Sequence, residues 1–269
     1  MKRKKTYSPN VIIGFVITGA MLLLILIGFI HTPYDITKMD SSAKLAAPSL
    51  RHLMGCDNFG RDIFSRVLKG MGNTFVIASA TVAIGTFCGV IVGAFTGYFG
   101  GLLDEVLMRV NDVVFAFPSI LLALVFVSIF GTGKYNVIGA LGIAFIPSFA
   151  RIVRGEFIKY RDMDYVKSAR LAGVGPLRMI FVHILPNTMP VLMSSVMIGF
   201  NNAVLAEAGM SYLGIGVQPP SASLGSMLSE SQTYLFSAPW YALFPGLMII
   251  LMVLGLSLLA DRGEKYIRK

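Results

Sequence analysis

Charged residues are scarce in this chain, and they are concentrated in the connections between its apolar runs. Only 14% of the 269 residues are Asp, Glu, Lys or Arg, whereas 55% are hydrophobic. A single soluble core cannot bury so many apolar side chains, so the composition predicts an integral membrane protein. The apolar runs also offer no charged residues of the kind that mark a proton relay or an ion-coupled carrier.

Cysteine and histidine are rare, and motifs of hydrolytic chemistry are missing. Cys56 and Cys88 have neither disulfide nor metal-site spacing, and we interpret them as small buried thiols. There is no HExxH, no GxSxG and no paired nucleophile and base. The run GTGK at 131–134 is not a phosphate loop, because Ser128 replaces its first glycine. We therefore predict a chain with no catalytic residues, no metal site and no cofactor of its own.

Six apolar runs are long enough, or nearly long enough, to cross a membrane as helices. A span needs about 20 apolar residues. The first run follows the basic residues Lys2 to Lys5 and lacks a small-residue cleavage site, so we interpret it as a retained span. Between the first two runs, Ile63, Phe64, Val67 and Leu68 share one helical face and predict an amphipathic surface helix within 53–70. The predicted spans are 11–30, 74–98, 110–130, 137–150, 189–206 and 240–260.

The predicted architecture is thus all-α, with six transmembrane helices. We divide the chain into 1–72 (N-terminus, first span and extracellular amphipathic segment), 73–261 (five-helix transmembrane domain) and 262–269 (tail). In the second span, glycines at four-residue spacing expose backbone for close helix packing: Gly85, Gly89, Gly93 and Gly97. Pro118 and Pro147 are expected to bend or loosen the third and fourth spans.

Basic residues distribute unevenly between the two sides of the membrane. If both termini are cytoplasmic, 16 of the 23 Lys and Arg residues lie inside and 7 outside. The positive-inside rule therefore predicts cytoplasmic termini and a multi-pass protein of the cell membrane. Because the net charge of +9 is explained in this way, nucleic acid is not an expected partner.

A polar stretch at 162–186 lies on the predicted cytoplasmic side. Asp164 is expected to cap a short helix whose Val166, Ala169 and Gly173 share a face. Gly173 suits a left-handed helix end, and Pro176 suits the first turn of the next helix. Such a helix beside a membrane could bind another protein, although an ordinary loop between two spans remains an equal alternative on these grounds.

The same stretch resembles the EAA loop of permease subunits of ATP-binding-cassette (ABC) importers. Lys167-Ser168-Ala169, Gly173 and Ile184-Leu185-Pro186 match its pattern, with Lys167 in place of the usual Glu and Ser168 in place of the first Ala. The resemblance extends over about 51–261 and is to the "C" subunit of the dipeptide, oligopeptide and nickel permease family. It is carried by 52–66 (HLMGCDNFGRDIFSR), 97–124, 150–156 (ARIVRGE), 183–187 (HILPN), 207–220 (EAGMSYLGIGVQPP) and 237–247.

This resemblance implies a type I importer permease fold with a cytoplasmic coupling helix. It implies three kinds of partner besides lipid: a second homologous permease chain, two ABC ATPases and an extracellular or periplasmic substrate-binding protein. ATP and Mg²⁺ would bind to the ATPases. The residues expected to couple to the ATPase are Asp164, Tyr165, Lys167, Ser168, Ala169, Gly173 and Pro186. Those expected at an outer gate or at the docking site of the binding protein are Glu207, Gly214, Gly216 and Pro219.

The function implied is transport of small peptides through a pathway of which this chain forms half. Import of nickel or a metal chelate is the alternative within the same family, because both subfamilies share these motifs. An ion channel is an alternative of another class, although the sequence shows no ring of charges and no filter. A membrane scaffold would account for the glycines but leaves the coupling-like loop unexplained.

Overall fold

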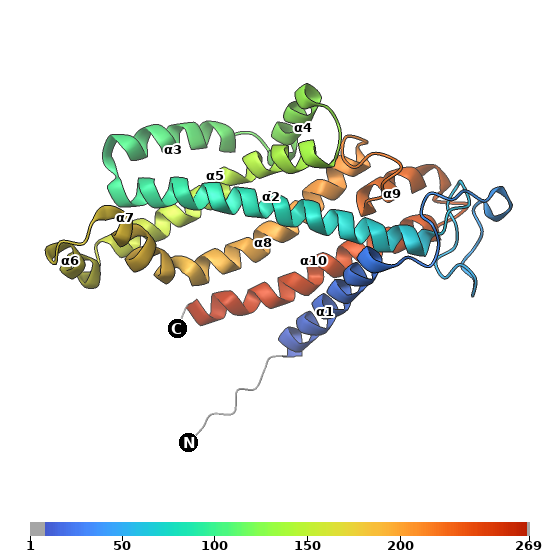
Figure 1. Ribbon diagram of the computed structural model, residues 1–269, viewed down its shortest axis with the longest axis horizontal. Helices are drawn as coiled ribbons and strands as arrows, with labels where there is room; N and C mark the ends of the chain where they lie inside the picture. Colours follow the sequence, from blue (N-terminus) through green and yellow to red (C-terminus); the bar gives the residue numbers. More distant parts are fainter. Residues whose placement is uncertain (1–8, 268–269) are drawn as a thin grey trace, which may run out of the picture.

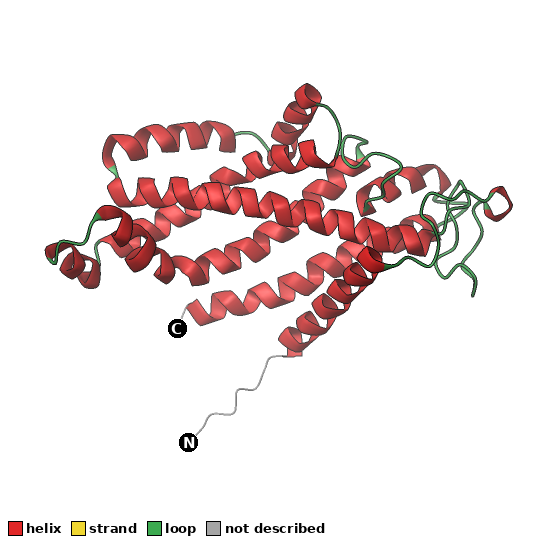
Figure 2. Cartoon of the chain, viewed as in Figure 1, coloured by secondary structure: helices red, strands yellow, loops and turns green. Residues whose placement is uncertain are grey.

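The computed structural model is a bundle of long helices with helical and irregular segments at its two ends (Figure 1). The structure describes the backbone of residues 9–267 and the side chains of residues 9–260. Within this part the chain forms helices and loops, and the only β-type pairing is an isolated bridge between Cys56 and Asp62 (Figure 2). The basic residues Lys2 to Lys5 and the side chains of the tail lie outside the described residues.

Five continuous helical segments are long and apolar enough to cross a membrane. The fourth is composite, because the short helix α7 (Pro176–Arg178) and the π-helical stretch η2 (Met179–Ile184) lead directly into α8 (Leu185–Tyr212). A sixth span is present if the bent pair described below counts as one. The segments are α1 (Pro9–Ile30), α2 (Ile63–Phe99), α5 (Lys134–Arg161), α7 to α8 (Pro176–Tyr212) and α10 (Trp240–Ile267).

The third predicted span is broken rather than merely bent. Helix α3 (Gly101–Phe115) and helix α4 (Ser119–Phe130) meet at 86° on either side of Pro118. Pro118 has no N–H to donate, and it disfavours helical geometry in the residue before it, so the helix stops at this point. The guanidinium of Arg154 on α5 holds α3 by donating to both carboxylate oxygens of Asp104, at 2.5 and 2.6 Å.

The predicted amphipathic surface helix within 53–70 is wrong. Ile63, Val67 and Leu68 do share a face, but they form the first turns of α2, and each is at most 1% exposed. Asp62 starts the helix, because its carboxylate accepts a hydrogen bond from the backbone N–H of Ser65 at 2.7 Å. A short amphipathic pattern cannot distinguish a separate surface helix from the buried start of a longer one.

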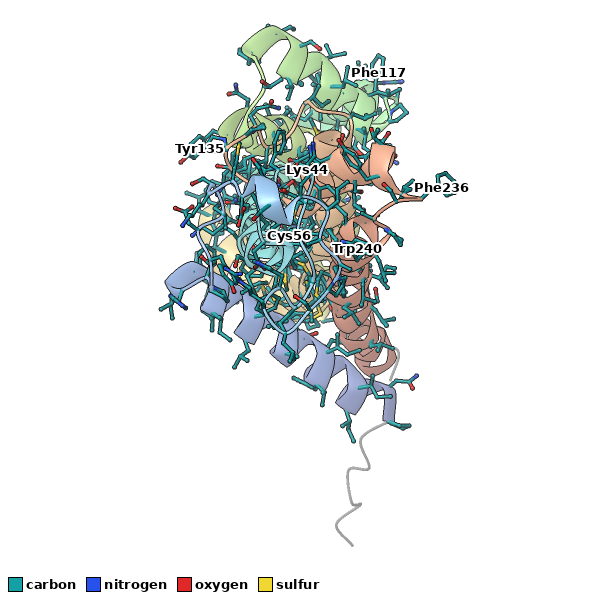
Figure 3. All side chains as sticks on the ribbon, turned by 90° about the vertical axis from the view of Figure 1, so that its right-hand side faces the viewer. Lys44, Cys56, Phe117, Tyr135, Phe236 and Trp240 are labelled. Carbon is teal, nitrogen blue, oxygen red and sulfur yellow. The ribbon has the colours of Figure 1, made fainter. Side chains whose placement is uncertain are left out.

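The two ends of the bundle differ. Helix α6 (Asp164–Leu171) and α7 lie at one end, here called the α6 end (Figure 1). At the other, the α9 end, lie the 32–62 segment with the 3-10 turn η1 (Ser41–Ala43), helix α9 (Leu224–Ser231) and η3 (Gln232–Tyr234). Figure 3 views the α9 end, where Cys56 lies near the centre and Phe236 at the edge.

Helices α2 and α5 pack against each other along the glycine face of α2. A Cβ added at Gly93 would lie 2.4 Å from the carbonyl oxygen of Ala150. One at Gly89 would lie 2.5 Å from the Cβ of Phe149, and Gly85 and Gly97 make similarly close approaches to α5. Dispersion and Cα–H···O contacts become available at such separations, so the partner of this face is a helix of the same chain.

Candidate functional site

Helix α6 projects at one end of the bundle between two membrane-length helices, α5 and the α7 to α8 segment (Figure 1). The side chain of Val166 is fully buried and fixes the helix to the bundle, whereas Leu171 is 90% exposed. The helix therefore has one anchored face and one free face. A displacement of α6 would act directly on α5 through the short link at 162–163 and on α8 through α7 and η2.

The joint after α6 has the predicted backbone geometry, but the predicted N-cap at the start of α6 is wrong. Gly173 has a φ of +81°, and Pro176 is the first residue of α7. Asp164, however, is the first helical residue, and the N-cap is Met163, which makes no side-chain cap. The carboxylate of Asp164 nevertheless lies in the first turn of α6, where the helix dipole favours negative charge.

A π-helical stretch follows α7 directly and ends at Ile184, two residues before Pro186. Pro186 cannot donate to the carbonyl of Val182, and its ring would clash with that carbonyl in an ordinary α-helix, so the wider π-turn accommodates it. The amide of Asn187 donates to the carbonyl of His183 at 2.7 Å and to the hydroxyl of Tyr165 on α6 at 3.3 Å. These contacts connect α6 to the start of α8.

Lys167, which stands where the EAA pattern has Glu, faces solvent. Its ammonium lies 3.8 Å from the carboxylate of Asp164 one turn earlier, and both side chains are more than half exposed. An exposed pair of this kind contributes less than about 1 kcal/mol to stability. The charge of Lys167 is thus available to a partner protein.

Tyr165 lies on the same helix, and desolvation raises the pKa of its phenol, which stays neutral. The coupling role of the seven residues named above stays a prediction.

At the α9 end, a buried ion cluster connects the 32–62 segment with α2 and α9. Arg66, only 1% exposed, donates to the carboxylates of Asp57 and Glu230, the latter at 2.9 and 3.0 Å. Arg61 also donates to both carboxylates, and the hydroxyl of Tyr241 on α10 donates to Glu230 at 2.7 Å. Burial raises the pKa of the neighbouring Cys56 thiol to about 11, so this buried thiol stays protonated.

The sequence predicted Glu207 in the loop after the fifth span, but it lies inside α8, which continues to Tyr212. Its side chain is fully buried and accepts hydrogen bonds from the hydroxyls of Thr74 at 2.8 Å and Ser211 at 2.7 Å. A helix of small residues can extend past the end of the apolar run, which hydropathy alone does not reveal. Glu207 is thus a buried carboxylate one residue beyond the predicted span 189–206, which itself contains no acidic residue.

The other residues predicted at an outer gate or docking site lie after α8, and they differ in exposure. Gly216 is buried against Ser211, where an added Cβ would lie 2.0 Å from the hydroxyl oxygen. It is therefore not available to a docking protein in this conformation, and neither is Glu207. Gly214, with a φ of +80°, and Pro219 are exposed, and their contact with a partner stays a prediction.

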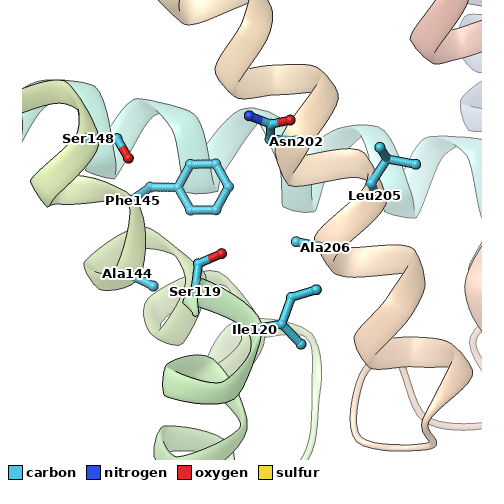
Figure 4. Close-up of a pocket in the computed structure, with 8 residues that line it drawn as sticks. All are labelled: Ser119, Ile120, Ala144, Phe145, Ser148, Asn202, Leu205 and Ala206. Atoms are coloured by element: carbon cyan, nitrogen blue, oxygen red, sulfur yellow. The ribbon is translucent and has the colours of Figure 1, made fainter. Parts of the chain in front are cut away.

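Two recesses lie along one side of α8. The first, of about 280 Å³, is bounded by α4, α5 and α8, and the side chains of Ser119, Phe145 and Asn202 converge on it (Figure 4). The second, of about 310 Å³, lies between α8 and α10 and shares Asn202 and Leu205 with the first. Among the described residues, no group of three or more His, Cys, Asp or Glu is arranged to hold a metal ion.

Comparison with known proteins identifies the family. Residues 89–269 match the family described as "Binding-protein-dependent transport system inner membrane component". The chain belongs to this family. It is 36% identical over 250 residues to the dipeptide transport system permease protein DppC of Alkalihalophilus pseudofirmus, covering 93% of this chain and 82% of that protein. It is 39% identical to the glutathione transport system permease protein GsiD of Pectobacterium atrosepticum, over 90% of this chain and 81% of that one.

The fold is that of a type I ABC importer permease. A chain of the MetNI methionine ABC transporter, in a structure described as inward facing, superposes with a TM-score of 0.62 at 17% identity, covering 73% of this chain and 94% of that one. The protein is therefore a multi-pass inner-membrane permease subunit without catalytic activity of its own, and its family implies ATPase and substrate-binding partners. This assignment replaces the channel and scaffold alternatives.

Two features of the structure were missed by sequence reasoning. The cluster around Arg66 joins residues 57, 61 and 66 to residue 230, a separation that no local pattern reveals. Its signal in the sequence is the alternation of acidic and basic residues at 57–66. Asn202 was also missed, although an amide within an apolar run is a sequence signal that can be read without a structure.

Proposed function

We propose that this chain forms half of the translocation pathway of an importer for small peptides. Both relatives described above are permeases named for peptide substrates, a dipeptide and glutathione. Nickel or a metal chelate is not favoured by these names. The second half of the pathway would come from a homologous permease chain, with two ATPases on the cytoplasmic side and a binding protein on the other. ATP and Mg²⁺ would bind to the ATPases and not to this chain.

The observation that carries the proposal is the position of α6. It is a short helix with an exposed face, held at one end of the bundle and linked at both ends to membrane-spanning helices. An ATPase that binds the exposed face differently in its open and closed states would shift the permease between two conformations, because only a difference in contact free energy can do so. Helices α5 and α8 would transmit the shift, since both continue from the α6 segment into the bundle.

The proposal requires that the α6 end and both termini face the cytoplasm. The basic residues of 151–187 support this orientation, and the 207–239 segment at the opposite end contains no Lys or Arg. On the α6 surface, Lys167 and Arg170 would meet acidic groups of the ATPase, in contrast to the Glu-containing pattern of other family members. Lys167→Glu is therefore expected to weaken ATPase binding here, whereas Lys167→Arg retains it.

The test is purification of the tagged chain from mildly solubilised membranes, followed by mass spectrometry of its partners and of any ligand held by a co-purified binding protein. We expect two ATPases, one sister permease and a bound short peptide. A bound metal or metallophore would overturn the substrate assignment. A chain that purifies without an ATPase, even after crosslinking, would overturn the coupling assignment.

A further inference from the structure

The first recess combines polar side chains from three different helices. Ser119 begins α4, Ser148 lies at the middle of α5, and Asn202 lies on α8 (Figure 4). The remaining lining is apolar: Ile120, Ala144, Phe145, Leu205 and Ala206. A polar group facing hydrocarbon without a hydrogen-bond partner is costly. Three such groups gathered around one recess therefore indicate that it is filled by water or by a polar solute.

The second recess carries an independent indication of the same kind. Asn201 is 8% exposed, and its amide nitrogen donates to the hydroxyl of Ser257 at 2.9 Å. Its carbonyl oxygen, however, is buried and has no hydrogen-bond partner among the described residues. The amide of the adjacent Asn202 likewise has none within that part of the chain. A buried acceptor without a partner, beside a recess of about 310 Å³, has the capacity to bind a donor that enters it.

The two recesses adjoin each other along α8, and together they are here called the track. They share Asn202 and Leu205, and the second continues along α8 through Ile198 to Ser194, toward the α6 end. Ser194, Ile198 and Asn202 follow one another at four-residue spacing, so they share a face of the helix. Because α5 and α8 bound the first recess and also connect to α6, a displacement of α6 would change its shape.

Among the residues 9–260, whose side chains the structure describes, neither recess is lined by Asp, Glu, Lys or Arg. A lining of amides and hydroxyls can both donate to peptide carbonyls and accept from peptide N–H groups. It offers no fixed charge that would select or reject a charged peptide side chain. The chemistry thus matches the feature that all short peptides share, their backbone, and not any particular side chain.

We propose that this track is the solute-contacting surface of the subunit, with Asn202, Ser148 and Ser119 as its hydrogen-bonding residues for the peptide backbone. This inference rests on the proposed function and names the groups that act in it. Each recess alone is near the lower limit of small-molecule sites, about 300 Å³. A facing chain completes the enclosure, which agrees with the role of this subunit as half of a pathway.

The test introduces charge into the track of the complete transporter in proteoliposomes, with its ATPases and binding protein. Uptake of a neutral, a cationic and an anionic tripeptide is measured for Asn202→Asp, Asn202→Lys and Ser148→Asp. We expect Asn202→Asp and Ser148→Asp to raise the ratio of cationic to anionic uptake by about tenfold, and Asn202→Lys to lower it by a similar factor. Both uptake rates are measured on the same proteoliposomes, so a lower yield of assembled transporter does not change their ratio.

Ser128→Asp is the matched control, because Ser128 is exposed on α4 but does not line either recess. Its uptake ratio should remain that of the unmodified transporter. An unchanged ratio in all three track variants, with normal uptake by the unmodified complex, would refute the track and leave the proposed function intact. Absence of peptide uptake by the unmodified complex would instead refute the proposed function.

A second measurement covers the case in which the charged variants do not assemble. Asn202→Cys, in a background with Cys56 and Cys88 replaced by Ala, is treated with a water-soluble thiol reagent in the assembled transporter. We expect labelling that slows at least severalfold when peptide, binding protein and ATP are all present. A thiol that is never labelled, or whose labelling is insensitive to peptide, would overturn the assignment.

Discussion

Replacement of Gly93 by alanine tests the packing of α2 on α5 most sharply. The added Cβ would lie 2.4 Å from the carbonyl oxygen of Ala150 and 2.8 Å from the Cβ of Val153. Ordinary van der Waals contact begins near 3.4 Å, so α5 would have to move away from α2 by about 1 Å. Both neighbours are backbone or Cβ atoms, which no change of rotamer can move. Overpacking of this kind costs about 1–3 kcal/mol.

Gly155→Ala supplies the matched control. Gly155 also lies within a long helix, α5, but an added Cβ would meet nothing within 4 Å. Both substitutions gain the same helix propensity, up to about 1 kcal/mol, so this gain cancels in the comparison. We therefore expect Gly93→Ala to be less stable than Gly155→Ala by about 1–3 kcal/mol, a factor of roughly 5 to 150 in the unfolding equilibrium.

The assay is SDS denaturation of the purified chain in mild detergent, followed by circular dichroism and by the fluorescence of Trp240, the single tryptophan. The midpoint for Gly93→Ala should fall below that of the unmodified chain, while that for Gly155→Ala should equal or exceed it. Equal midpoints for the two variants would refute the inferred close packing of α2 against α5.

Two further predictions concern the α9 end. Arg66→Met should destabilise the chain by about 3–5 kcal/mol, because it removes one of the two buried guanidinium groups that pair with Asp57 and Glu230 and leaves both carboxylates to Arg61 alone. Arg151→Met, which breaks an exposed pair with Asp112, should cost less than about 1 kcal/mol. The same SDS titration compares the two variants, and equal losses would contradict the role of the cluster. Cys56 should resist alkylation at pH 8, since burial raises its pKa to about 11 and leaves on the order of 10⁻³ of it as thiolate. Its labelling, measured by mass spectrometry, should increase as pH rises toward 11 and be complete in SDS; rapid labelling of the native chain at pH 8 would show that the thiol is not buried.

The sequence predicted the spans well where apolar length alone decides them. The runs at 11–30 and 240–260 correspond closely to α1 and to the apolar part of α10. Helix ends were predicted less well, because α2, α5 and α8 all continue beyond their apolar runs into more polar sequence, most of which the bundle buries in α2 and α8. Ile63 and Glu207 were misplaced for this reason: their burial depends on segments distant in the chain.

Local backbone conformation, in contrast, was predicted correctly where a residue has few conformational choices. Gly173 and Pro176 occupy the positions expected of a left-handed helix end and a first helical turn. Pro118 was recognised as a bend, but its 86° angle depends on contacts of α3 and α4 with α5 that the sequence does not show. The track along α8 could not be predicted either, because apolar periodicity in a membrane does not distinguish the lipid face from the solute face.

The central claim is that α6 contacts the ATPase, and site-specific photocrosslinking in membranes containing the whole transporter tests it most directly. A photoreactive phenylalanine analogue would replace Leu171 on α6 or, as a control, Phe236 at the α9 end, both of which are highly exposed. We expect an ATPase adduct from position 171 whose yield changes when ATP is trapped, and no ATPase adduct from position 236. An adduct from position 236, or none from position 171 in an intact complex, would contradict the account.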